Sequence, residues 1–571
     1  MYKLIDSKNV NVFEPISTIF KNRNISPEDI DWFIKPTKFE HSPLLLGNVH
    51  QAVELSLKHI NKGYHIHVQI DKDLDGFTSS AILINYLKRV YPNLSISWSN
   101  HTTKKKHGID MDLIPEDTAL FIVPDAASNE YEIHKQLHDK GIDVLILDHH
   151  EAPHYSEHAV TVNNQLDKYP NKWLSGAGIV FKFIQVLDEK LGLNYANDYL
   201  DLVAFGMVGD AMQLSSKETK WLITKGLSNI KNEFLKEIIK ENVDDGVELT
   251  PSALSFKCNP KINAYLRMAS TEELDELFMA LLGHQEVTEN PRLRKADKSE
   301  TWARRITRIC NNMYAKQRKL KDKLIEELSI KIENEKLYEN TFMVVEIEGD
   351  FEMNMSGYIA SFLVNKYRKP TLILRKDEEN DTELVGSMRG YDKTLKDTRT
   401  FLQDLNLFVT AEGHNQASGL RIKRENFELL DESINEALKH VDLDEDYLVD
   451  LILPGKSVTS SFVNDIERYS HVFGKGLEAP TFAVEGLEIN LGDSSLMGKD
   501  QNMIKFVSNG ISYIKFNDAD ELIKLRSQNK TAILNVVGRT GINSYRGNTE
   551  PQFVIEAYEI VEVKDTARFV F

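Results

Sequence analysis

Short apolar runs alternate with helical stretches over the first part of the chain. Residues 64–70, 119–123 and 144–147 predict strands, and the apolar spacing of residues 77–90 predicts a helix. Strands that alternate with helices favour a parallel sheet with crossover helices. An acidic residue follows each predicted strand within two positions, so we expect these side chains to meet at the carboxyl edge of the sheet, where open α/β sheets bind their ligands.

A long polar segment at 300–336 keeps its apolar residues at helical spacing. This spacing predicts one helix that connects two lobes. A second α/β lobe is expected after it, with strands at 342–347 and 371–374 and a helix at 357–367.

Short apolar runs also dominate the last part of the chain, where turn signals separate them. The runs are 513–516, 533–537 and 553–558, and the turn signals are Gly498, Asn509-Gly510, Gly538 and Arg546-Gly547. This pattern predicts a small β-barrel.

The predicted fold class is therefore α/β, with two α/β lobes joined by a long helix and a C-terminal OB-type β-barrel. A chain of 571 residues is too long for one hydrophobic core. The expected domains are an N-terminal segment at 1–45, a first α/β domain at 46–235, a helical connector at 236–338, a second α/β domain at 339–445 and a β-barrel domain at 446–571.

The composition is typical of a globular protein, with 41% hydrophobic and 27% charged residues. No apolar run approaches the roughly 20 residues that cross a bilayer, and the first residues lack the layout of a secretory signal. We therefore expect a cytoplasmic protein that does not associate with membranes. The two cysteines, Cys258 and Cys310, lack zinc-finger spacing and are expected to be reduced core thiols.

The formal net charge of −18 opposes binding of a polyanion. However, the affinity for nucleic acid depends on the charge along the binding track, and carboxylates gathered around metal ions also count as negative. The net charge therefore leaves nucleic acid open as a partner.

Asp71, Asp73 and Asp75 stand at alternate positions between a predicted strand and a predicted helix. Like charges so close together repel one another unless a cation lies among them. A divalent metal site explains the spacing. The alternatives are a solvated acidic turn or a calcium loop, although an EF-hand needs flanking helices and a later glutamate.

Asp148, His149 and His150 follow another predicted strand. Adjacent histidines on an irregular segment can face different partners, so one can bind a metal ion while the other contacts a phosphate. A pair of surface histidines is the commoner meaning of such a dipeptide. The position directly behind an apolar strand favours a functional site.

Four ordered motifs resemble those of the DHH phosphoesterase superfamily. They are Asp73 with Asp75, Asp125, the triplet Asp148-His149-His150, and Asp210. Further segments are similar to RecJ-like exonucleases, which act on single-stranded DNA. These are 175–178 and 260–268 in the first part, 356–361, 386–389 and 413–419 in a region like the DHH-associated domain, and 473–482 and 537–552 in a region like the C-terminal OB-type domain of RecJ.

The resemblance implies a first lobe that is the catalytic DHH domain and holds two Mn²⁺ or Mg²⁺ ions. Asp125 is expected to bridge the ions. The other expected ligands are Asp73 for one ion and Asp75, His149 and Asp210 for the other.

Three further residues are implied to act beside the ions. Some members of the superfamily carry a histidine where this chain has Gln69, so one ion is expected to rely on Asp71 or on water. Asp148 is expected to orient a neighbouring histidine. His150 is expected to stabilise the attacked phosphate.

The implied substrate-binding residues lie mainly in the second lobe. Ser387, Arg389 and His414 are expected to donate hydrogen bonds to phosphate and to hold the terminal nucleotide. Arg267, in the RecJ-like segment 260–268, is expected to join them. A surface salt bridge is the alternative for Arg389.

Segment 100–108 departs from the family pattern. Related exonucleases have an arginine near the 5′-phosphate where this chain has His101. Lys104, Lys105 and Lys106 can compensate electrostatically, or they form a solvated charge run. The preferred DNA end therefore stays open.

Two other features suit a nucleic-acid partner but have plainer alternatives. Between Arg304 and Lys323, eight basic residues accompany one acid, Asp322, which predicts either a track for the strand or a solvent-exposed face. Tyr545 and Phe482 are expected to be base-stacking platforms or core residues.

The sequence thus predicts a metal-dependent exonuclease that degrades single-stranded DNA from the 5′ end in recombination, repair or replication. We expect a monomer, with a single-strand-binding protein or a helicase as candidate partners. One alternative is a DHH phosphodiesterase for short oligoribonucleotides or cyclic dinucleotides, but those enzymes generally end after the second lobe. The other is a non-catalytic DNA-binding scaffold, which would not need the acidic and histidine ligands.

Overall fold

A computed structural model gives the fold in two units, one comprising Asn311–Asp446 and the other Tyr2–Cys310 with Tyr447–Phe571. The structure describes residues 2–6, 11, 13–101, 108–244, 246, 248–290, 298–347, 355–377, 380–391, 394–439, 446–498, 501–516, 519–545 and 548–565.

Five parallel strands form the first sheet, in the order β3-β2-β4-β5-β6. They are β2 (His65–Ile70), β3 (Ile96–Asn100), β4 (Thr118–Pro124), β5 (Asp143–Asp148) and β6 (Val160–Asn163). Nearly every residue of β4 and β5 is buried, as expected for strands that are covered on both faces. Since β3 and β4 lie on opposite sides of β2, the order of the strands reverses there and creates a topological switch point.

Helices cover this parallel sheet, which confirms the predicted α/β fold. α4 (Leu74–Val90), α6 (Gly176–Leu191) and α7 (Leu200–Gly209) pack against one another, and α5 (Tyr131–Asp139) packs on the core around Phe121 and Ile146. The other helices of this part are α3 (Val49–Lys62), α8 (Lys217–Leu227), α9 (Glu233–Asn242), α10 (Pro251–Ala253), α11 (Asn259–Met268) and α12 (Thr271–Leu281).

Helix α4 begins three residues before the predicted start at residue 77. The side chain of Asp73 accepts a hydrogen bond from Gly76 N at 2.8 Å and so caps the first turn. A strand, not a helix, precedes this acidic segment, so the EF-hand alternative is wrong.

α13 (Trp302–Asn334) confirms the predicted long helix. A hairpin of β7 (Val287–Glu289) and β8 (Ser299–Thr301) precedes it. The hairpin was not predicted. Within the described ranges, no helix combines the length and the apolar character needed to span a membrane.

The second sheet has the order β12-β13-β11-β10-β9, and only the β9–β10 pair within it is parallel. Its strands are β9 (Met343–Ile347), β10 (Thr371–Lys376), β11 (Glu383–Arg389), β12 (Phe408–His414) and β13 (Ala417–Lys423). Residues of α14 (Ser356–Tyr367) share one core cluster with strand residues. Residues of α15 (Thr398–Asp404) and α16 (Arg424–Leu438) share another.

The C-terminal sheet has seven strands in the order β15-β16-β20-β21-β19-β18-β17. They are β15 (Leu451–Pro454), β16 (Phe482–Asn490), β17 (Ser495–Met497), β18 (Met503–Ser508), β19 (Ile511–Lys515), β20 (Lys530–Tyr545) and β21 (Asn548–Asp565), with α17 (Ser460–Glu467) and α18 (Asp520–Ser527) beside them. β16 and β18 are not neighbours in this order, yet Ser508 Oγ of β18 donates a hydrogen bond to Glu488 O of β16 at 3.4 Å. The sheet therefore curls and brings these two strands together.

The predicted turn at Gly538 is wrong. Gly538 lies inside the 16-residue strand β20, at a shift in the register with β21. A Cβ atom at this position would overlap Val554 O, so the glycine allows two strands to approach closely. The Arg546-Gly547 turn signal falls outside the described residues.

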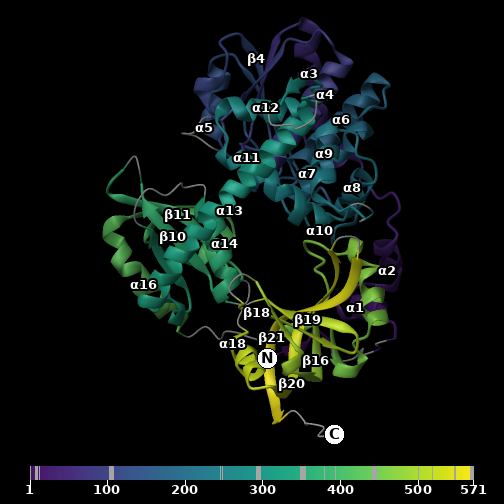
Figure 1. Ribbon diagram of the computed structural model, residues 1–571. Helices are drawn as coiled ribbons and strands as arrows, with labels where there is room; N and C mark the ends of the chain where they lie inside the picture. Colours follow the sequence, from purple (N-terminus) through teal and green to yellow (C-terminus); the bar gives the residue numbers. More distant parts are fainter. Residues whose placement is uncertain are drawn as a thin grey trace. The chain divides into compact units, whose positions relative to one another are not determined.

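The N-terminal segment forms a separate two-stranded sheet with the strand that precedes the C-terminal sheet, a contact that the sequence did not predict. β1 (Tyr2–Leu4) pairs in parallel with β14 (Tyr447–Val449). In Figure 1, α1 (Pro15–Asn22) and α2 (Pro27–Ile34) lie beside the C-terminal strands. Phe20 of α1 stacks on Phe473, with 6.0 Å between the ring centroids.

We predict that Arg23→Met lowers the free energy of unfolding by about 3 kcal/mol. Arg23 donates to both carboxylate oxygens of Asp450, at 2.7 and 2.8 Å, and the Asp450 side chain is only 1% exposed. The substitution would leave a buried carboxylate without its cation. Urea unfolding followed by circular dichroism measures the change. Arg468→Met is the control, because the Arg468–Asp465 pair is exposed; an equal loss in both variants would contradict the prediction.

Candidate metal centre

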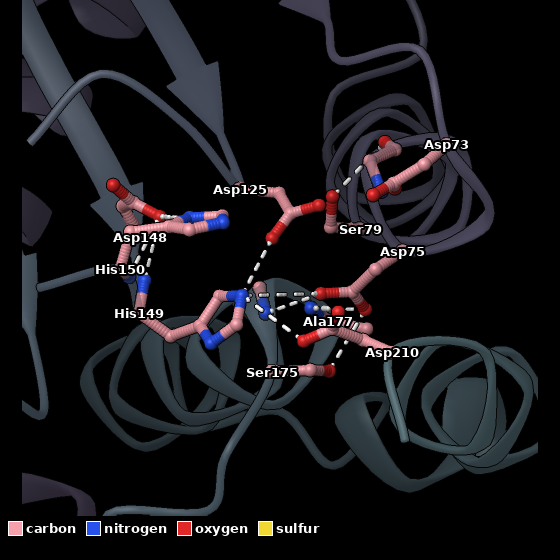
Figure 2. A network of polar contacts seen from close by, with 12 residues as sticks. Asp73, Asp75, Ser79, Asp125, Asp148, His149, His150, Ser175, Ala177 and Asp210 are labelled. Carbon is pink, nitrogen blue, oxygen red and sulfur yellow. Dashed lines mark hydrogen bonds and ion pairs between the residues drawn. The ribbon is translucent and has the colours of Figure 1, made fainter. Parts of the chain in front are cut away.

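The predicted acidic and histidine residues come together at the carboxyl edge of the first sheet. Asp71 follows β2, Asp125 follows β4, and Asp148 ends β5. Asp210 lies directly after α7, which packs on α4. Figure 2 shows the side chains of Asp75, Asp125, His149 and Asp210 turned toward one another, as the strand order led us to expect.

Their donor atoms form three overlapping groups, within each of which the atoms lie no more than 4.8 Å apart. The groups are Asp71, Asp73 and Asp125; Asp75, His149 and Asp210; and Asp125, Asp148, His149 and His150. Asp125 and His149 each occur in two groups. A carboxylate that belongs to two neighbouring donor groups is in a position to bridge two cations.

His149 lies at the centre of the second group. Its Nε2 atom is 3.1 Å from Asp125 Oδ1, 3.4 Å from Asp210 Oδ2 and 4.0 Å from Asp75 Oδ2 (Figure 2). Among the described residues, no donor gives a hydrogen bond to the buried Asp125 Oδ1 or Asp210 Oδ2 atoms. Buried acceptors without donors are costly, and a cation would satisfy them. The side chains therefore fit a divalent metal ion.

The electrostatics of the carboxylates lead to the same conclusion. Burial, and then the negative charge of Asp73, raise the pKa of Asp75 to about 6. Burial and the neighbouring carboxylates raise the pKa of Asp125 and Asp210 well above the ordinary value. Without a cation, the full charge of this cluster is unfavourable.

The N-terminus of α6 holds Asp75 in place. Ser175 Oγ and Ala177 N donate to Asp75 Oδ1 at 2.8 and 3.1 Å, and Gly176 N donates to Asp75 Oδ2 at 2.5 Å. A Cβ atom at Gly176 would lie 2.5 Å from Asp125, so only glycine lets the helix approach so closely. The sequence marked 175–178 only as a resemblance; a serine and two glycines before an apolar helix were the available signal.

The buried Asp148 and the partly exposed His150 form an ion pair beside the cluster. Asp148 Oδ1 is 2.8 Å from His150 Nδ1 and accepts a hydrogen bond from His149 N at 2.7 Å. Burial opposes the charge on both groups, but their mutual attraction is stronger. It holds the pKa of Asp148 well below its usual range and raises the pKa of His150 to about 10. His150 is therefore cationic at neutral pH, and 34% of its side chain is exposed.

His101 lies next to the cluster, on the segment that departs from the family pattern. It follows β3 directly, and its Nε2 atom is 3.7 Å from Asp71 Oδ1. Gln69 Oε1 accepts a hydrogen bond from Asp110 N at 2.9 Å, so this amide oxygen is already engaged. Lys104, Lys105 and Lys106 lie outside the described residues.

The expected phosphate-binding residues of the other unit lie on β11 and β12, the two strands that flank β13. Ser387 Oγ of β11 is 2.8 Å from Ser356 Oγ at the start of α14. Arg389 and His414 both stand opposite Ala417 in the strand register. A Cβ atom on the adjacent helix residue, Gly357, would lie 2.6 Å from Arg389 Nη2. These groups can form one polar face of the second sheet. Arg267 is on the exposed side of α11, in the first unit.

Some of the basic charge on α13 is neutralised by acids from outside the helix. Arg305 pairs with Glu276 at 2.8 Å, and Arg308 pairs with Glu300 at 2.5 Å. Both interpretations of this helix stay open for its other basic residues.

Phe482 is a core residue, not a stacking platform. It is fully buried and packs edge-on against Phe462, with 5.4 Å between the ring centroids. The side chain of Tyr545 is not among those that the structure describes. Cys258 and Cys310 are buried free thiols, as predicted.

The parallel sheet, its switch point and the shared carboxylate define a class of α/β proteins with a site for divalent cations. A sequence profile of the DHH family, N-terminal domain, matches residues 65–207, and a profile of the RecJ OB domain matches residues 449–557. The chain is 36% identical over 578 residues to YorK of Bacillus subtilis (strain 168), covering 99% of both chains. YorK is prophage-derived and is named, provisionally, as a single-strand DNA-specific exonuclease. The chain therefore belongs to the RecJ-like branch of the DHH family.

Two more distant relatives carry the RecJ name. The single-stranded-DNA-specific exonuclease RecJ of Bacillus subtilis (strain 168) is 23% identical over 552 residues, which are 91% of this chain and 64% of that protein. The crystal structure of RecJ from Thermus thermophilus in complex with Mn²⁺ has a TM-score of 0.74 at 17% identity, covering 98% of this chain and 79% of that one. This last likeness shows that the fold is shared.

We predict that Mn²⁺ raises the thermal unfolding midpoint of the protein. A ligand that binds only the folded state stabilises it by about 2.7 kcal/mol at a hundredfold excess over its Kd. Asp210→Asn should stabilise the metal-free protein, because it removes one of the repelling carboxylates, and should lose most of the response to Mn²⁺. Differential scanning fluorimetry with EDTA or Mn²⁺ measures both effects. Glu233→Gln, at an exposed acid, should change neither; an Asp210→Asn variant with the full Mn²⁺ response would contradict the prediction.

Proposed function

We propose that this protein is a metal-dependent exonuclease that hydrolyses the phosphodiester bonds of single-stranded DNA. The observation that carries the proposal is the set of overlapping donor groups in which Asp125 and His149 each occur twice. The names of YorK and RecJ support single-stranded DNA as the substrate. The proposal includes action from the 5′ end, in recombination, repair or replication.

The proposed cofactors are two Mn²⁺ or Mg²⁺ ions. Asp73 and Asp71 would hold one ion, and Asp75, His149 and Asp210 would hold the other. Asp125 belongs to the first group and its Oδ1 atom is 3.1 Å from His149 Nε2 of the second, so it would be a ligand of both ions. When bound, such ions supply an activated water at neutral pH and neutralise charge on the phosphoryl oxygens. The Mn²⁺ in the related RecJ crystal structure supports this choice of ion.

His150 is the proposed phosphate contact in the first unit. Its Nδ1–H is held by Asp148, which orients the ring, and the protonated ring would donate a hydrogen bond to a substrate oxygen. The positive charge of this ring would stabilise negative charge that develops on the attacked phosphate. Asp148 acts on the substrate through His150 and needs no contact of its own.

Residues of each unit are proposed to contact the DNA strand. Ser387, Arg389 and His414 would donate hydrogen bonds to phosphates of the terminal nucleotides. His101 and Arg267 would add contacts on the side of the first unit, together with Lys104, Lys105 and Lys106. Because these contacts neutralise phosphates, binding should weaken as the salt concentration rises.

Three further points belong to the proposal. The domain boundaries are those predicted from the sequence, at 1–45, 46–235, 236–338, 339–445 and 446–571. The protein acts as a monomer in the cytoplasm. A single-strand-binding protein or a helicase would supply or expose its substrate.

A panel of labelled substrates tests this function. With Mn²⁺ present, we expect a 5′-labelled single strand to release its label as the first product, and duplex DNA to be cut at least about tenfold more slowly. The panel also contains a 3′-labelled strand, dinucleotides and a cyclic dinucleotide, with products resolved on denaturing gels. Early release of the 3′ label would contradict the proposed polarity. Preferred cleavage of dinucleotides would favour the alternative phosphodiesterase.

Asp125→Ala is the matched control for this panel. It removes the shared carboxylate, so hydrolysis should fall by about a thousandfold or more. Binding of single-stranded DNA, measured by fluorescence anisotropy, should persist. If the wild-type protein binds DNA and cuts none of the substrates in Mn²⁺ or Mg²⁺, the non-catalytic scaffold is the better description.

We predict that Arg389→Ala weakens binding of a single strand by about 1.5 to 3 kcal/mol, because a charge-assisted bond to phosphate is lost. Arg389→Lys should recover only part of the affinity, since an ammonium cannot bond in bidentate fashion. Anisotropy titrations at two salt concentrations measure both. Arg421→Ala is the control, because Arg421 already pairs with Asp377 and Glu383. Equal losses in the two alanine variants would count against a role for Arg389 in binding.

A further inference from the structure

The turn that follows Asp210 is strained. Helix α7 ends at this residue, and Ala211 takes a left-handed conformation with φ +55°. Ala211 N donates to Val208 O at 3.3 Å and Met212 N donates to Met207 O at 2.9 Å, a pattern that usually has glycine in the left-handed position. An alanine there is disfavoured by its Cβ atom. Such conformations persist where the surrounding structure holds them.

A glycine-containing loop of the C-terminal domain, residues 473–478, packs on this turn. Leu214 N donates to Lys475 O at 2.7 Å. A Cβ atom at Gly476 would lie 2.8 Å from Gln213 Cβ, and one at Gly474 would overlap Leu214 Cδ1. Both glycines therefore allow the loop to lie close against the segment that starts at Asp210.

The loop is itself anchored on both sides. The buried ammonium of Lys220, in α8, donates to Val472 O at 2.9 Å. Phe473 stacks on Phe20 of the N-terminal helix α1. The loop is thus held by the first α/β domain and by the N-terminal segment, and it is a rigid support for the turn.

We propose that loop 473–478 is a positioning element for Asp210, so that the C-terminal domain helps to build the metal centre in addition to any contact with DNA. The loop fixes the strained turn through Leu214 and Gln213, and the turn fixes the direction of the Asp210 carboxylate. The inference rests on the proposed role of Asp210 as a metal ligand. Groups that orient metal ligands commonly change metal affinity by about ten- to a hundredfold.

Mn²⁺ binding to the full-length protein, followed by the EPR signal of free Mn²⁺ without DNA, tests this proposal. Gly476→Ala should weaken the binding of one ion by about tenfold or more, because the new methyl group displaces Gln213. Gly510→Ala is the matched control in the same domain. Gly476 has φ +74° and Gly510 has φ +75°, so the backbone strain is equal, but a Cβ atom at Gly510 meets nothing within 4 Å. This control should bind Mn²⁺ as the wild-type protein does.

A rescue variant distinguishes a loss of Asp210 positioning from a general loss of folding. Ala211→Gly removes the strain of the left-handed residue, so the turn no longer needs the loop to hold it. Combined with Gly476→Ala, it should restore most of the lost Mn²⁺ affinity. If Gly476→Ala fails to fold, Gly474→Ala is the second variant, because its methyl group meets only the end of the Leu214 side chain. It should weaken Mn²⁺ binding in the same direction.

The outcomes of this experiment separate the inference from the proposed function. Equal Mn²⁺ affinity in the Gly476→Ala and Gly510→Ala proteins would overturn the positioning role while leaving the nuclease proposal intact. Loss of affinity that Ala211→Gly does not rescue would also overturn it. A wild-type protein that binds no Mn²⁺ would instead contradict the proposed metal centre itself.

Discussion

Repulsion among buried carboxylates is the constraint on which the rest of the structure depends. Asp75 and Asp125 are almost fully buried, and Asp210 lies close to Asp75. Burial and mutual repulsion raise the pKa of all three. A fold that collects such groups needs compensation from a bound cation or from fixed donors. The N-terminus of α6 supplies donors for Asp75, and the geometry around Asp125 leaves room for cations to supply the rest.

The parallel sheet explains how distant residues meet. β2, β4 and β5 are neighbours in the sheet, so the residues at their carboxyl ends lie side by side although up to 77 positions separate them in the chain, from Asp71 to Asp148. Figure 2 shows the resulting arrangement, with Asp125 between the residues from α4 and the histidines after β5. The same edge also carries the cationic His150, which gives the site a positive group that does not depend on metal ions. Charge of both signs at one edge suits a phosphodiester, whose reaction adds negative charge at phosphorus.

Apolar periodicity and the acidic residues after strands were enough to predict β2, β4 and β5 of the first sheet, α13 and the convergence of the cluster, but not the outer strands β3 and β6. The sequence could not show contacts that depend on tertiary packing. Gly538 has the local signature of a turn, and only the neighbouring strand reveals that it permits a close approach. Likewise, the sequence around Phe482 does not show whether its ring stacks on a base or fills the core. Its packing against Phe462 shows that it is a core residue. The pairing of β1 with β14 joins segments more than 440 residues apart, which local patterns do not report.

The geometry of the metal centre depends as much on backbone strain as on the motif residues. Asp125 and Ala127 are left-handed, with φ +67° and +76°, as is Ala211 after Asp210. The first two shape the loop after β4 so that Ser128 N reaches Asp148 Oδ2 at 3.0 Å, which helps to hold the partner of His150. Each of these conformations costs about 1 to 3 kcal/mol and needs neighbours that hold it. The acidic motif therefore specifies which atoms could bind the ions, whereas contacts far along the chain specify where those atoms lie.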